Sequence, residues 1–63
     1  MVRMKIRVFY GNGTKEVLGA VKGFGIVGSD KVGKDGHILY QVAIRFDDDD
    51  ADILRDVRRI EEV

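Results

Sequence analysis

Cysteine and proline are both absent from this chain of 63 residues, and no long apolar run is present. Without cysteine, neither a disulfide nor a thiolate zinc site can form. No stretch approaches the roughly 18–20 apolar residues of a membrane-spanning helix. The start MVRMKIRVFY alternates charged with apolar residues, unlike the core of a signal peptide. We therefore expect a cytoplasmic protein without membrane contact, formed by a single domain over residues 1–63.

Side chains for nucleophilic catalysis are scarce. The chain has one serine (Ser29), one threonine (Thr14) and one histidine (His37), and the last two lie beside predicted turns. No glycine loop carries the lysine of a phosphate-binding motif. The acidic run Asp47–Asp50 could ligate a hard cation but lacks the spacing of an EF-hand, so helix capping and a solvated turn explain it better. We expect no enzyme activity, no cofactor and no metal site.

The net charge is zero, yet the charge is divided along the chain. Residues 1–45 hold 8 basic and 3 acidic residues, for a net charge of +5, whereas residues 46–63 hold 3 basic and 8 acidic, for −5. Two surfaces of opposite potential suit a binding protein or a self-complementary homo-oligomer better than an enzyme.

The segment 4–22 predicts a strand hairpin. Met4, Ile6, Val8 and Tyr10 alternate with a basic outer row, and Asn12-Gly13 suits the positive φ angles of a two-residue type I′ turn. A turn centred there would place Val8 opposite Val17 and Met4 opposite Val21 on the core side. As an alternative, Thr14 could cap a short helix over 14–22 that ends before Gly23.

Residues 24–46 predict further strands. Glycine alternates with bulky apolar residues from Gly23 to Gly28, which indicates a bent or bulged strand. Asp35-Gly36 marks a turn, and the alternation from Ile38 to Phe46 is the strongest strand pattern in the chain. If the strands pair about a turn at Asp35-Gly36, their apolar residues match poorly, so we expect a bulge or a longer loop between these strands.

Residues 50–62 predict an amphipathic helix. Its apolar residues fall on one helical stripe and fail strand alternation: Ile53, Leu54, Val57, Ile60 and Val63. Asp49 or Asp50 would cap the helix, whose acidic outer face would point away from any ligand.

The candidate binding surface is basic. Arg3, Lys5 and Arg7 form a row on one strand, which Arg45 and Lys22 could join, while Phe24 and Ile26 supply apolar groups. Cations for phosphates and apolar side chains that stack or wedge are what a sheet-based nucleic-acid binder requires.

Two families of small β-barrels resemble this layout. The opening Ile6-Arg7-Val8-Phe9-Tyr10 with Lys15-Glu16-Val17, and the ending from Asp50-Ala51-Asp52-Ile53-Leu54 to Glu62, are similar to the first hairpin and terminal helix of the seven-kilodalton archaeal chromatin proteins. That family folds as an SH3-like barrel and binds the DNA minor groove with apolar wedges, and Phe24 and Ile26 stand where such wedges lie. However, the family is strongly basic and this chain is neutral. The segments Gly23–Val27 and Tyr40–Asp48 also resemble SH3-like and Tudor-like protein-binding modules.

We therefore expect an α+β, mainly β fold: a small SH3-like barrel of antiparallel strands with a C-terminal amphipathic helix. The expected function is non-enzymatic nucleic-acid binding through Arg3, Lys5, Arg7, Lys22, Phe24, Ile26 and Arg45. A protein partner, or an oligomerising barrel, is the first alternative. The second is a β-α-β-β-α, ACT-like or ferredoxin-like domain that senses a small molecule, for which 14–22 would be a helix.

Overall fold

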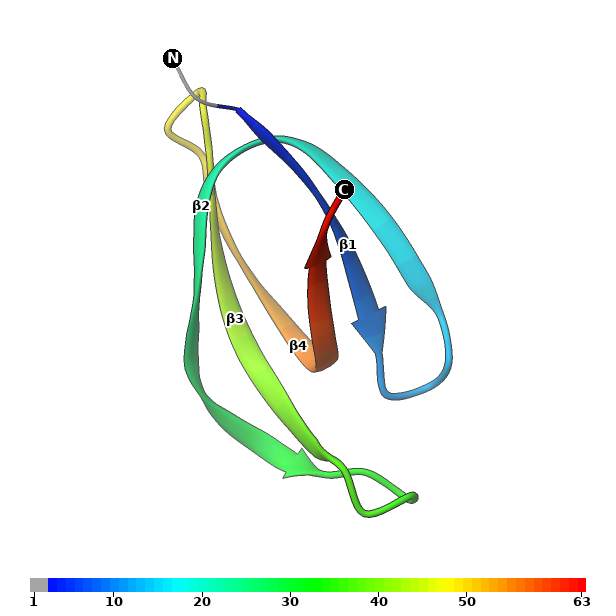
Figure 1. Ribbon diagram of the computed structural model, residues 1–63. Coiled ribbons are helices and arrows are strands. Elements are labelled where there is room, and N and C mark those ends of the chain that lie inside the picture. Colours follow the sequence, from blue (N-terminus) through cyan, green and yellow to red (C-terminus); the bar gives the residue numbers. More distant parts are fainter. Residues whose placement is uncertain (1–2) are drawn as a thin grey trace.

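The computed structural model describes residues 3–63 and contains four antiparallel strands (Figure 1). These are β1 (Met4–Tyr10), β2 (Lys15–Val32), β3 (Ile38–Phe46) and β4 (Ala51–Glu62). Each strand pairs with the next in sequence, and β4 also pairs with β1, so the strands close into a ring. The prediction of a small, mainly β barrel is confirmed at this level. Its SH3-like character stays a prediction, because several small β folds close in this way.

The two long strands β2 and β4 each bend and serve two neighbours (Figure 1). β2 pairs with β1 up to Val21 and with β3 beyond it, and β4 passes from β3 to β1 at Val57. At the bends, Ala20 and Asp56 both have a φ of 57°, in the left-handed region. Two layers result. The first layer holds residues 15–20, β1 and residues 57–62, and the second holds residues 22–32, β3 and residues 51–56.

The core lies between these layers and is entirely aliphatic. Six side chains are at most 1% exposed: Ile6, Val8, Val21, Val42, Ile44 and Val57. No polar side chain is buried among residues 3–63. Burying one large apolar side chain stabilises the folded state by about 1.5–3 kcal/mol, because its surface is removed from water. At one end, Leu39 packs so closely on Gly11 that a Cβ there would lie 2.7 Å from the leucine Cδ1.

All three loops between strands have the same construction. In each, an amide donates to the carbonyl four residues later, as from Tyr10 to Thr14 at 2.9 Å and from Phe46 to Asp50 at 2.8 Å. An Asn or Asp side chain at the loop centre accepts from a following amide, and the next residue has a positive φ. The sequence pairs responsible are Asn12-Gly13, Asp35-Gly36 and Asp48-Asp49. This is the three-residue hairpin loop, a turn followed by a left-handed residue.

The first hairpin has a different register from the predicted one. Its loop comprises residues 11–13 and not two residues, so Val8 pairs with Glu16 and Ile6 with Leu18. As a result Val17 points outward and is 50% exposed. The bulge at Ala20 then restores the predicted pair of Met4 with Val21. Side chains alternate along a strand, so one extra loop residue turns the side chains that follow the loop to the opposite face from the predicted one.

The predicted helix over 50–62 is wrong: these residues form β4. Leu54, Val57 and Ile60 do face inward, but two bulges produce their spacing of three. One lies between Leu54 and Val57 and the other between Val57 and Arg59, and each inserts an extra residue into the alternation. Ile53, which the helical stripe would bury, is 57% exposed. As a strand, the segment supplies backbone partners to both β1 and β3, which a helix could not do.

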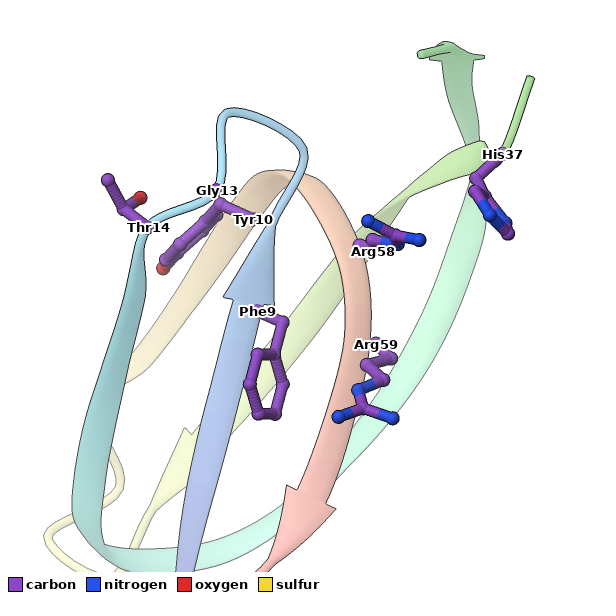
Figure 2. A pocket seen from close by; sticks show the side chains of 7 residues that line it. All are labelled: Phe9, Tyr10, Gly13, Thr14, His37, Arg58 and Arg59. Carbon is purple, nitrogen blue, oxygen red and sulfur yellow. The ribbon is translucent and has the colours of Figure 1, made fainter. Parts of the chain in front are cut away.

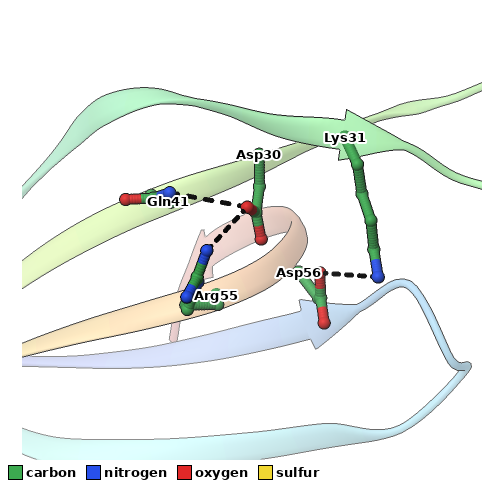
Figure 3. Close-up of polar contacts among 5 residues, drawn as sticks. All are labelled: Asp30, Lys31, Gln41, Arg55 and Asp56. Carbon is green, nitrogen blue, oxygen red and sulfur yellow. Dashed lines mark hydrogen bonds and ion pairs between the residues drawn. The ribbon is translucent and has the colours of Figure 1, made fainter.

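The alternative helix over 14–22 is also wrong, because these residues lie in β2, and the ACT-like arrangement is excluded with it. Between β2 and β3 the predicted irregularity is confirmed as three shifts of register. The far end of β2 is tied to the bend of β4 by side chains (Figure 3). Arg55 donates to Asp30 at 3.1 Å, and Lys31 lies 3.4 Å from Asp56. Residues 3–63 include no helix long and apolar enough to span a membrane.

Candidate nucleic-acid interface

The outer face of the first layer carries a group of cations around an aromatic ring. Ile6 and Val8 point into the core, so the odd-numbered residues of β1 point outward with their cross-strand partners. Lys15, Phe9 and Arg59 form one row across the three strands, and Val17, Arg7 and Glu61 form the next. With Lys5 beyond them, these residues define a surface that we name the β1 face: Lys5, Arg7, Phe9, Lys15, Val17, Arg59 and Glu61.

The β1 face is positive although the chain is neutral. It holds four cations and one carboxylate, for a net charge of +3. That carboxylate, Glu61, is shared: it lies 2.9 Å from Arg59 and 3.9 Å from Arg7. The Arg59 guanidinium also lies over the ring of Phe9, 4.4 Å from its centroid. Such a cation–π contact keeps the arginine positioned, and the guanidinium donors that Glu61 does not engage can bind an anion.

An open cavity of about 560 Å³ continues the β1 face toward the loops (Figure 2). Figure 2 shows Arg59 on β4 beside Phe9 on β1, with Arg58 nearer the loops. The lining residues are Phe9, Tyr10, Gly13, Thr14, His37, Arg58 and Arg59. Asp35 holds Arg58 at 3.2 Å and lies 3.9 Å from His37. The backbone amide of His37 lowers the pKa of Asp35, assisted by Arg58, so this carboxyl is charged when it positions the arginine.

Tyr10 stands between the cavity and the inner side of the first hairpin. Its hydroxyl donates to the Glu16 carboxylate. Burial raises the pKa of Tyr10 to about 12, and the hydrogen bond to Glu16 acts in the same direction. The phenol therefore stays neutral and serves as a donor throughout the physiological range.

The structure separates the residues that the sequence suggested as one site. Lys5 and Arg7 lie on the β1 face, whereas Arg45 is on β3, between Gly23 of β2 and Ala51 of β4. Arg3 and Lys22 lie at the β3–β4 loop, 2.8 Å from Asp47 and 3.6 Å from Asp49 respectively. The run Asp47–Asp50 is thus a turn that takes up two of the predicted cations, and it does not cap a helix.

Phe24 and Ile26 lie in the second layer, away from the basic row. They pair with the buried residues Ile44 and Val42 and therefore share the inward side of that layer. They lie at its open edge and are 44% and 65% exposed. No surface of the first layer includes them, so these apolar groups do not stand beside the Arg3, Lys5 and Arg7 row.

Sequence reasoning missed Lys15, Arg58 and Arg59 as members of the site. A helix over 50–62 would carry both arginines on an element whose outer face points away from the ligand, whereas the observed strand pairing brings Arg59 beside Phe9. One signal was available: four β-branched residues between Ile53 and Val63 disfavour a helix and favour a strand. Among residues 3–63, no cluster of three acidic or histidine side chains is placed to hold a metal ion.

Comparison with protein-family models, with curated proteins and with solved structures finds no match to this chain.

Proposed function

We propose that the protein binds single-stranded nucleic acid through the β1 face, without catalysis. The observation that carries this proposal is the row Lys15–Phe9–Arg59, an aromatic ring between two cations on an open antiparallel layer. Cations contact phosphates, and the accessible part of an aromatic ring offers a stacking surface to any base. Lys5 and Arg7 extend the positive surface along β1.

The geometry favours a single strand over a duplex. Wedging into a duplex minor groove needs apolar side chains next to the cations, and Phe24 and Ile26 lie on the other layer. Phe9 is half-buried, with the Arg59 guanidinium over its ring, which suits contact with an unpaired base better than insertion between paired ones. The cavity lined by Arg58, Thr14 and His37 could receive a phosphate or base that continues past Phe9.

The expected affinity is modest. For a single strand, log K falls with log salt at a slope of about −0.7 for each phosphate neutralised, so a net charge of +3 gives a slope near −2. Non-specific binding of this kind commonly has a Kd of about 10⁻⁴–10⁻⁶ M at physiological salt. Binding should therefore be measured from low salt upward.

Fluorescence anisotropy of labelled DNA and RNA, both single-stranded and duplex, tests the proposal. Arg59→Ala should weaken single-strand binding and flatten the salt slope, because it removes one cation of the β1 face. Arg45→Ala is the matched control: it removes the same charge from β3, outside that face. Phe9→Leu should weaken binding without changing the slope, since stacking contributes no charge.

Two results would refute the proposal. One is the absence of any binding at low salt, where a phosphate site is strongest. The other is an equal effect of Arg59→Ala and Arg45→Ala, which would mean that overall charge and not the β1 face is responsible. The alternative of a protein partner is favoured by one separate feature, the apolar edge of β2.

A further inference from the structure

The second half of β2 presents an uncharged backbone edge. The segment Gly23–Ser29 pairs with β3 on one side, and no other described strand pairs with its opposite side. It contains no charged residue and exposes Phe24, Ile26 and Val27 at 44%, 65% and 60%. The three glycines of this segment, Gly23, Gly25 and Gly28, have open space where a Cβ would lie.

Such an edge is unusual within this protein. Natural sheets protect their edges with charges, proline or a covering segment, since free amides and carbonyls otherwise recruit another strand. The edge residues 15–19 carry Lys15 and Glu16, and β4 carries a charge at most positions along its length. Gly23–Ser29 alone lacks that protection among the strand edges that the structure describes, and it adds exposed apolar side chains.

We propose that this edge pairs antiparallel with the same edge of a second copy, related by a twofold axis near Gly25. In this register Phe24 of one copy lies opposite Ile26 of the other, twice. Both side chains are on the inward side of the second layer, because they pair with Ile44 and Val42, so the two copies present them to the same side. The stretch Gly23–Ile26 is also free of register shifts against β3.

Charge at the two ends of the edge favours this arrangement. Lys22 precedes the segment and Asp30 follows it. Antiparallel pairing brings the Lys22 end of each copy to the Asp30 end of the other, whereas parallel pairing would bring like charges together. Within one copy Lys22 lies 3.6 Å from Asp49, and this ion pair is exposed, so a contact with the other copy can replace it at little cost. Asp30 is already held by Arg55 and Gln41 (Figure 3), and the Arg55 hydrogen bond lowers its pKa, so its charge is retained.

The interface is small, which sets the concentration needed to observe it. A short edge with three exposed apolar side chains falls below the roughly 800 Å² per partner of a stable complex. We therefore expect dissociation in the range of about 10⁻⁵–10⁻³ M, as for weak and transient assemblies. The inference is independent of the proposed nucleic-acid binding, because the edge lies outside the β1 face.

Sedimentation equilibrium of the full chain, from micromolar to millimolar concentration, is the test. The mass should rise to that of a dimer and no further, because twofold pairing uses the edge completely. Ile26→Lys should abolish the rise, and Ile53→Lys is the matched control, since Ile53 is equally apolar and 57% exposed on β4. Lys22→Glu should weaken the dimer, while Lys34→Glu, with the same charge change in a loop, should not.

A monomer at all concentrations would overturn the inference. So would a dimer that Ile53→Lys removes and Ile26→Lys does not, or assembly that continues beyond two copies. Circular dichroism of each variant checks that the fold is intact, and both substituted isoleucines are exposed. Ile26→Lys should leave single-strand binding in place, so the failure of either proposal can be told from failure of the other.

Discussion

Glu61 is the one acidic residue on the β1 face, and its neutralisation should strengthen nucleic-acid binding. Its carboxylate contacts Arg59 at 2.9 Å and Arg7 at 3.9 Å, so it competes with phosphate for both. Glu61→Gln keeps the size and removes the charge, which raises the net charge of the face from +3 to +4. With about 0.7 of slope for each charge on a single strand, this corresponds to about fivefold tighter binding at 0.1 M salt.

Glu62→Gln is the control for this prediction, because it makes the same change in net charge one residue away. Glu62 pairs with the buried Ile6 and therefore does not share the outer face. Anisotropy titrations of both variants with a labelled single strand, over a range of salt concentrations, should separate them. An equal gain for the two variants, or no gain for Glu61→Gln, would refute the assignment of the β1 face.

Three further predictions concern the fold. Val57→Ala should lower the free energy of unfolding by about 2 kcal/mol, whereas Ile53→Ala should change it by less than about 0.5 kcal/mol. Denaturant melts measure both values, and equal losses would favour the helix that the sequence suggests. In the same melts, Ala20→Gly should stabilise the protein by about 0.5–1 kcal/mol, because glycine adopts the left-handed φ of this position without strain. Gly13→Ala should destabilise it by about 1–2 kcal/mol through its positive φ alone, since the added Cβ would meet no neighbouring atom. Because the pKa of Tyr10 in the folded protein is raised to about 12, its contribution to stability should be complete below pH 10 and lost as the pH rises through 12. A titration followed by phenolate absorbance should show a step with a midpoint near pH 12, and this step should be missing in Tyr10→Phe.

The turns of this protein could be predicted from local sequence with useful accuracy. Asn12-Gly13 and Asp35-Gly36 mark hairpin loops because asparagine and aspartate bond to nearby amides and glycine accepts a positive φ. The loop length could not be predicted in the same way. A two-residue and a three-residue loop use the same dipeptide, and only the pairing of the whole hairpin chose between them, which placed Val17 outside.

The site was only half predictable for a related reason. Lys5 and Arg7 lie on one strand, so alternation alone places them on one face. Arg59 is distant from Lys5 and Arg7 in sequence, and it lies beside them only because β4 pairs with β1 and closes the ring. Arg45 does not join them, because β3 is a neighbour of β2 and β4 but not of β1. Phe24 does not join them either, because it lies beyond the bend of β2, in the part that pairs with β3.

The amino-acid sequence by itself determined the strands β1 and β3, the position of the turns and the apolar character of the core. These follow from alternation and turn chemistry, which act over a few residues. The tertiary structure decided the form of residues 51–62 and therefore the composition of the β1 face. An apolar spacing of three suits a helix or a twice-bulged strand equally well, and only the unpaired edges of β1 and β3 select the strand.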